Sequence, residues 1–298
     1  MKFIYDNIDN TYPCISEYLL NINNYPSLCS DNYLKHPYSI YIDSLNLISR
    51  RTIKVIRELN GNFDVDELSD DVDNMLDAYI EHYDDILNII KIIISENPTE
   101  KIKKIKDKYM KEIKNIRDPL GEIVNKIKHD HRRVKVFEIN GDDQKKYYGF
   151  YIEGVGENGI VIPDERIHKS FKGMRTAFSF ARFLRSLIVD IFHLSGIMTA
   201  LFKEISRSKS RLDIEINIQN LEKFKEMIKC VSMFDEHFFI DEAEMSIPYI
   251  RVGKRIEIGR EITSYRKLIP SGRINLQMSI DEHKRSFGFI YWLPSGVY

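Results

Sequence analysis

The longest regular apolar pattern in the chain runs from Leu68 to Ile94. Apolar side chains recur there every three or four residues, which places them on one face of a helix of about seven turns. The acidic residues of its first turns are favoured by the helix dipole and lack the loop spacing of a metal site. A long helix with one apolar face has to cover that face with other helices, so the pattern predicts a helical bundle.

Three further segments complete the predicted bundle. Helical spacing runs from Tyr41 to Leu59 and stops at Asn60-Gly61. Another helix opens at Pro98-Thr99, and its apolar stripe continues in phase across Pro119. This segment is therefore either one kinked helix or two short helices in line. The last predicted helix spans Thr176 to Ile205 and is strongly apolar.

The length of the 176–205 helix permits a membrane span. Its interior nevertheless contains Arg182, Arg185, Asp190 and His193, and central Asp or Arg residues each cost about 2.5–3.5 kcal/mol in a bilayer. We therefore expect a core helix and no membrane partner. The arginines face either a polar site or the surface. Asp190 and His193 lie on adjacent turns. Either the two side chains form a hydrogen bond with each other, or His193 is a core histidine whose ring nitrogens bond to other groups.

The apolar period changes from helical to alternating after Val134. The runs Val134–Ile139, Lys146–Glu153 and Gly159–Ile162 are β-branched or aromatic and are separated by glycine-containing turns. They predict a small antiparallel β-meander at 134–162, inserted into the bundle.

The chain ends are predicted to differ from the bundle. Residues 1–38 are expected to form an irregular arm with one short helix near Ile15 to Ile22. The segment 206–210 is the expected linker, and residues 211–298 the expected small α+β domain. That domain combines a strand at 212–218, a helix at 221–231 and later strand-like runs at 238–240, 247–252, 255–262, 274–280 and 287–292. The predicted fold class is thus α+β: a mainly helical bundle domain over 39–205, interrupted by the meander, then a small α+β domain.

Composition limits the kinds of function to be considered. The chain has 298 residues, of which 43% are hydrophobic and 30% charged, and its net charge is −1. A basic site therefore has to be local. Cys14, Cys29 and Cys230 have neither zinc-site nor disulfide-framework spacing, and Asp6 and Asp9 interrupt any signal-like run. We expect a cytoplasmic protein, of bacterial or phage origin given the abundance of Ile, Lys, Asn and Tyr.

The stretch from Asp118 to Lys135 carries the strongest chemical pattern. Asp118-Pro119 is typical of a helix start. Apolar residues then recur at helical spacing, which places His131 in the apolar stripe and His129 on the opposite face beside Asn125. Several basic residues surround the two histidines: Lys126, Lys128, Arg132, Arg133 and Lys135. One interpretation is a basic helix end that complements the dipole.

The other interpretation comes from a resemblance. The pattern Asn125-x-x-Lys128-His129-x-His131, at a helix end in a helical domain, resembles HEPN-like bacterial proteins over about residues 40–205. The active motif of that family is an Arg followed, after four to six residues, by a His, and it cleaves RNA at a dimer cleft. Lys126 and His131 have the four-residue gap, with Lys in place of Arg. Lys lacks the bidentate hold of a guanidinium on phosphate.

The resemblance implies roles for these side chains. His131 or His129 would accept the proton of an attacking 2′-hydroxyl, and Lys126 and Arg132 would hold phosphate. Further RNA contacts would come from Lys128, Arg133, Arg182 and Arg185. No metal or cofactor is expected, and the partners would be RNA and a second copy or another protein, in a bacterial defence or toxin system. The alternative is a non-enzymatic, two-domain assembly subunit, so catalysis stays open.

Overall fold

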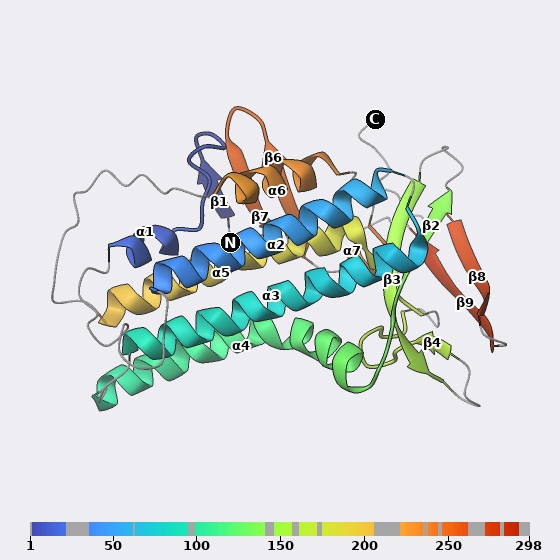
Figure 1. Ribbon diagram of the computed structural model, residues 1–298, viewed down its shortest axis with the longest axis horizontal. Coiled ribbons are helices and arrows are strands. Elements are labelled where there is room, and N and C mark those ends of the chain that lie inside the picture. The colour runs from blue at the N-terminus through green and yellow to red at the C-terminus, as the bar shows by residue number, and fades with distance from the viewer. Residues whose placement is uncertain are drawn as a thin grey trace.

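A computed structural model describes residues 2–21, 36–61, 63–94, 99–140, 146–156, 161–171, 175–205, 221–234, 236, 238–243, 246–261, 272–280 and 283–291. Its main feature is a group of four long helices, which Figure 1 shows side by side. They are α2 (Pro37–Leu59), α3 (Val65–Ile94), α4 (Glu100–His129) and α5 (Phe180–Ile205). The predicted α+β class with a helical bundle is confirmed.

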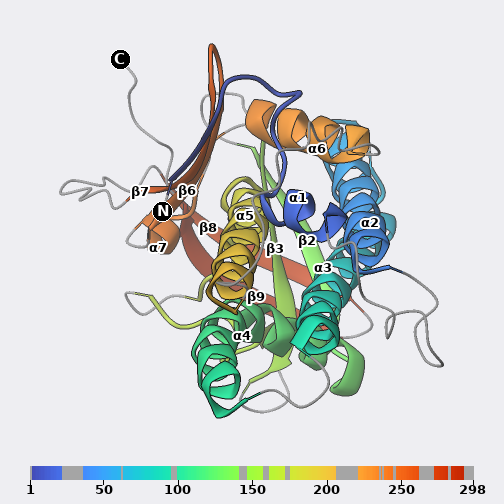
Figure 2. The same ribbon diagram turned by 90° about the vertical axis from the view of Figure 1, so that its left-hand side faces the viewer.

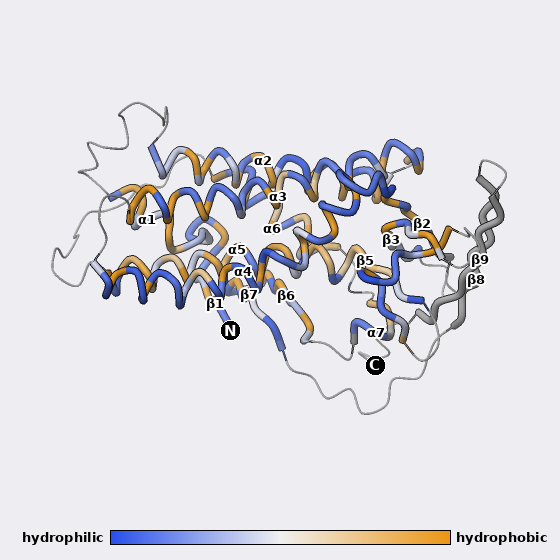
Figure 3. The backbone as a smooth tube through the Cα atoms, turned by 90° about the horizontal axis from the view of Figure 1, so that it is seen from below, coloured by the Kyte–Doolittle hydropathy of each residue, from blue (hydrophilic) through white to orange (hydrophobic). Residues whose placement is uncertain are grey.

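The helices differ in the fraction of their residues that is buried. α3 buries residues along its whole length, including Tyr79 and Tyr83, and α5 is central, with other helices around it (Figure 2). In contrast, α4 buries five of its 30 residues, and most of its residues are hydrophilic (Figure 3). Its apolar stripe packs on α5 and α3. α4 therefore presents most of its side chains to solvent.

α4 continues through Pro119 as a single helix, which decides between the two alternatives left by its sequence. The proline ring has no N–H group, so the carbonyl of Asn115 loses its usual helical partner. Leu120, Ile123 and Val124 follow at once and are buried in the same core as the residues before the proline. Burial of this stripe on both sides of Pro119 keeps the segment helical.

The β-meander is confirmed. It consists of β2 (Val134–Asn140), β3 (Lys146–Val155) and β4 (Val161–Pro163), and the short β5 (Phe178–Ser179) also pairs with β3. The strands are antiparallel, with Val134 opposite Ile152 and Gly154 opposite Ile162. Gly149 is required in β3, because a Cβ atom there would lie 2.5 Å from the Phe137 ring. The sheet begins directly after α4 and ends directly before α5.

The N-terminal segment, predicted as an irregular arm over 1–38 and described over residues 2–21, contains a strand that was not predicted. Residues Lys2–Tyr5 form β1, which pairs with β7 (Ile256–Glu261), and β7 pairs with β6 (Ile247–Val252). Alternation over four residues was too short to identify β1 from sequence. The predicted short helix is confirmed as α1 (Ile15–Leu20).

The remaining C-terminal elements are mostly those expected. α6 (Glu222–Met233) matches the predicted helix, and β8 (Gly272–Ile280) pairs with β9 (His283–Tyr291). The strand expected at 238–240 is wrong: α7 (Ile240–Ala243) begins there. The backbone turns at this point so that Glu242 can accept hydrogen bonds from Ser179 and Phe239. The predicted linker 206–210 and strand 212–218 lie outside the described residues.

Residues 221–261 pack on the bundle. Phe224 of α6 lies 5.8 Å from Phe192 of α5, between ring centroids, and Phe3 of β1 lies 5.6 Å from the same ring. Ile250 and Ile258 belong to the same buried cluster. In the described part of the chain, the two ends thus complete the core of the helices.

Among the described residues, α5 is the single helix long and apolar enough to cross a membrane. Most of its residues are buried against other elements, including the largest of them, Arg185, Phe180, Phe192 and Phe202. This burial is typical of a core helix in a soluble protein.

Candidate functional site

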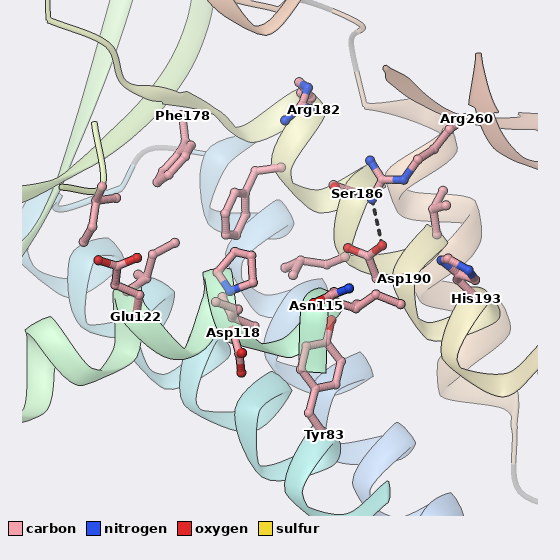
Figure 4. A pocket seen from close by; sticks show the side chains of 18 of the residues that line it. Tyr83, Asn115, Asp118, Glu122, Phe178, Arg182, Ser186, Asp190, His193 and Arg260 are labelled. Atoms are coloured by element: carbon pink, nitrogen blue, oxygen red, sulfur yellow. Dashed lines mark hydrogen bonds and ion pairs between the residues drawn. The ribbon is translucent and has the colours of Figure 1, made fainter. Parts of the chain in front are cut away.

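A hollow lies between α4 and α5, and we call it the α4–α5 pocket (Figure 4). Its volume is about 1000 Å³. Apolar side chains form much of its wall, and charged groups lie at both ends. The lining residues are Tyr83, Asn115, Ile116, Asp118, Pro119, Leu120, Glu122, Ile123, Arg166, Ile167, Lys169, Phe178, Arg182, Phe183, Ser186, Leu187, Val189, Asp190, His193 and Arg260.

One end of the pocket holds an ion pair between β7 and α5. Arg260 donates to Asp190 Oδ1 over 2.7 Å and to Ser186 Oγ over 2.8 Å, as Figure 4 shows in part. Burial raises the pKa of Asp190, and the Arg260 guanidinium opposes this rise. Burial also lowers the pKa of His193. The Asp190 carboxylate thus bonds to Arg260, which replaces the hydrogen bond to His193 considered from the sequence.

Arg182 lies beside the same pocket, and the buried Glu242 stands close to it. Arg182 donates to the Ser246 carbonyl over 3.4 Å, and its Nε atom is buried without an acceptor among the described residues. Glu242 accepts from the Ser179 and Phe239 N–H groups, each over 2.9 Å, and from the Ser179 hydroxyl. Burial raises the pKa of Glu242 to about 7, an effect the nearby Arg182 charge opposes.

A second hollow of about 660 Å³ lies along the last three turns of α4, and we call it the end hollow. It shares Asp118, Glu122 and Arg166 with the α4–α5 pocket, so the two spaces adjoin. Its full lining is Arg117, Asp118, Gly121, Glu122, Asn125, Lys126, His129, Asp130 and Arg166. This hollow contains part of the site predicted from the sequence.

The structure separates the two histidines of that prediction. His129 is the last residue of α4 and lines the end hollow. His131 lies beyond the helix, is exposed, and is not among the lining residues of either hollow. Its φ of 53° is left-handed, so the chain has already left the helix and His131 does not continue the apolar stripe. The predicted place of His131 on the helix face is wrong.

Lys126 lines the end hollow but is held by acidic groups. Its Nζ lies 2.7 Å from Asp130 Oδ2 and 3.8 Å from Asp164 Oδ2. The hydrogen bond from Lys126 lowers the pKa of Asp130, which is therefore ionised at neutral pH. A phosphate at this position would compete with two carboxylates for one ammonium group.

The other predicted cations are dispersed. Lys128 pairs with Asp77 over 3.0 Å, and Arg133 is exposed. The Nε atom of Arg132 is buried and has no hydrogen-bond partner within the described residues. Arg185 is fully buried, where it donates to the Ala181 and Phe234 carbonyls. Arg185 therefore faces neither solvent nor a ligand. Arg182 alone of this group lines the α4–α5 pocket.

Arg166 enters the site from the segment after β4, and local hydrogen bonds fix its backbone. Asp164 Oδ1 accepts from the N–H of Arg166 over 3.0 Å and from that of Ile167 over 3.4 Å. The same segment is anchored to β3 by His168, whose Nε2 accepts from Ile152 N–H over 2.9 Å. Burial lowers the pKa of His168 to about 3, so the ring is neutral and can accept. No hydrogen bond or ion pair of the Arg166 side chain occurs within the described residues.

Positive charge is concentrated on α4. This helix contains ten Lys or Arg and five Asp or Glu residues, a net charge of +5 in a chain whose net charge is −1. Most of its lysines are exposed. The helix thus forms a local basic element that leads to the end hollow.

Sequence reasoning missed Arg166 and Glu242, and it did not pair Arg260 with Asp190. Arg166 and Glu242 stand in loop-like sequence, and Arg260 is one of many basic residues near the C-terminus. The proximity of Asp164 and Arg166 to a strand end was the one available signal. Within the described residues, no group of three or more His, Cys, Asp or Glu side chains is placed to hold a metal ion.

Comparison with known proteins gives no match: no family model, no curated protein and no solved structure is similar to this chain.

Proposed function

We propose that this chain is a cytoplasmic RNA-binding protein, similar to HEPN-like bacterial proteins, that holds RNA phosphates along α4 and in the end hollow. One observation carries the proposal. α4 has a net charge of +5, is largely exposed, and leads to a hollow that contains both His129 and Arg166. Phosphate contacts by Lys and Arg supply most of the affinity for nucleic acids without a preferred sequence.

Arg166 supplies the guanidinium that the helical motif lacks. The motif has Lys126 where the family has Arg, and Lys126 is already paired with Asp130. Arg166 lines the same hollow and forms no side-chain hydrogen bond or ion pair within the described residues, although its charge helps to lower the pKa of Asp130. A guanidinium can hold two phosphate oxygens at once, whereas an ammonium acts as a point charge.

His129 is the candidate base for cleavage, in preference to His131. Its imidazole would accept the proton of a ribose 2′-hydroxyl, whose oxygen attacks the adjacent phosphorus and displaces the 5′-oxygen, which takes up a proton from water. The products are a 2′,3′-cyclic phosphate and a 5′-hydroxyl end. This reaction needs a base and charge stabilisation of the phosphate, which His129 and Arg166 would provide.

The acidic residues of the end hollow limit the affinity. Asp118, Glu122 and Asp130 face the same space as the cations. Their charges repel phosphate, so we expect weak binding with few phosphate contacts. The slope of log K against log salt is about −0.7 per phosphate contact for single strands.

The binding test uses a fluorescein-labelled single-stranded RNA and measures anisotropy across a salt series. Arg166→Gln should weaken binding and make the salt slope shallower by about 0.7, the loss of one phosphate contact. The matched control is Arg255→Gln, the same change on an exposed arginine of the β6–β7 hairpin, outside both hollows. An equal effect of both changes, or no binding at low salt, would refute the site.

The cleavage test incubates RNA with the protein in EDTA and assays 2′,3′-cyclic phosphate ends. His129→Gln should lower the rate by about 10²–10⁴, the usual effect of losing a general base. The control is His131→Asn, because asparagine tolerates the left-handed φ and this position lies outside the hollow. RNA binding with no cyclic phosphate product would leave a binding protein without catalysis.

The assembly alternative gains little support from the described surface. The large exposed hydrophobic side chains are each on a different element: Ile4, Val65, Val155, Met233 and Val252. Single exposed apolar residues are normal in soluble proteins. Light scattering of the purified protein would measure whether it forms the dimer that the family resemblance implies.

A further inference from the structure

The α4–α5 pocket has features that the phosphate-binding role of the end hollow does not use. It adjoins that hollow at Asp118, Glu122 and Arg166, which line both spaces. A group attached to a phosphate on Arg166 can therefore reach the pocket without crossing the protein surface. Its volume of about 1000 Å³ is ample for a flat ring of nucleobase size.

The wall of the pocket offers an aromatic face. Phe178 is half-buried, lies at the pocket edge (Figure 4), and is held by Phe150 and Phe183, whose ring centroids are 5.3 and 5.2 Å away. Ile116 of α4 and Leu187 of α5 extend the apolar wall. An aromatic ring fixed by its neighbours is a stacking surface for a base.

The far end of the pocket offers a donor beside an acceptor. Arg260 uses one terminal nitrogen for both Ser186 and Asp190, so its other N–H groups are not used in these bonds. Asp190 accepts from Arg260 through Oδ1, which leaves Oδ2 as a second acceptor. This end of the pocket is therefore polar, in contrast to the aromatic wall at Phe178.

From these observations we infer that the α4–α5 pocket receives one unstacked nucleobase of the bound RNA. The inference rests on the proposed RNA-binding function and names the form of RNA it requires: a single strand with an unpaired base next to the phosphate on Arg166. The base stacks on Phe178 while its phosphate is held by Arg166. Double-stranded RNA, whose bases are stacked and paired, is excluded from the pocket.

The test compares an RNA hexamer with hexamers that carry one abasic nucleotide, placed at each position in turn. Anisotropy gives the Kd of each for the parent protein and for Phe178→Leu, which keeps an apolar side chain but removes the ring. One abasic position should weaken binding by about 5- to 150-fold, the usual range for one stacked base. Phe178→Leu should weaken the intact hexamer by a similar factor and leave the abasic hexamer unchanged.

A second variant keeps the test decisive if Phe178→Leu lowers stability. Ile116→Trp adds bulk from a half-buried position on α4 at the pocket wall, and it should reduce binding of the intact hexamer to the level of the abasic one. Equal affinity of the parent for intact and abasic hexamers would overturn the base pocket while RNA binding stands. Binding of neither hexamer would overturn both the pocket and the proposed function.

Discussion

Glu242 should make the stability of this protein depend on pH in an unusual direction. This residue is 2% exposed, and burial raises the pKa of its carboxyl group from 4.5 to about 7. Between these two pH values the folded protein keeps a proton that the unfolded chain has lost. Stability from this group is therefore complete below pH 4.5, falls as pH rises, and is lost above pH 7. At about 1.4 kcal/mol per pKa unit, the total loss is about 3 kcal/mol.

Glu242→Gln removes the titration while keeping the side-chain shape. The amide cannot replace all three hydrogen bonds that the carboxyl accepts from Ser179 and Phe239, which costs about 1–3 kcal/mol at every pH. The pH-dependent part is separate. The free energy of unfolding of the parent minus that of the variant should decrease by about 3 kcal/mol between pH 4.5 and 7.

Urea denaturation at half-unit pH steps measures this difference, with the slope against urea compared between proteins. Burial also lowers the pKa of His82 and His168 to about 3. These histidines therefore lower the free energy of unfolding as pH falls below 6.5. Both proteins contain them, and their contribution cancels in the subtraction. Glu67→Gln, at an exposed position, is the matched control. Parallel pH curves for parent and Glu242→Gln would refute the reasoning.

Three further changes have distinct expected results. Arg185→Met should destabilise the protein by about 2–4 kcal/mol in urea, because the Phe234 carbonyl loses its buried donor, and RNA binding per folded molecule should not change. His131→Gly should raise stability by about 0.5–1 kcal/mol, since glycine relieves the left-handed φ; a loss would contradict the assigned backbone. Glu122→Gln should tighten RNA binding in the anisotropy assay by removing a negative charge from both hollows, and weaker binding would argue against phosphate in either.

Local periodicity was sufficient to predict much of the fold. The spacing from Leu68 to Ile94 predicted α3, and alternation after Val134 predicted the meander, because both patterns depend on neighbours within a few residues. The C-terminal end of α4 was not predicted correctly from periodicity. His131 continued the apolar spacing, yet the helix ends at His129, since periodicity does not include the left-handed φ that terminates it.

The site required contacts between distant parts of the chain. Lys126 and His129 were predicted from a motif within one helix, and both line the end hollow. Arg166 reaches this hollow from beyond a three-stranded meander, and Arg260 pairs with Asp190 across 70 residues. No local pattern encodes such pairs.

The sequence by itself determined the helices, the meander and the basic character of α4, because each follows from the order of apolar and charged residues along a short segment. Only the tertiary structure decided which charges are available. It buried Arg185, paired Lys126 with Asp130, left the Arg166 side chain without an ion pair in the described part of the chain, and gave Glu242 its raised pKa. The physical reason is that burial and pairing depend on which side chains approach in space, and the same residue type can be solvated, paired or buried accordingly.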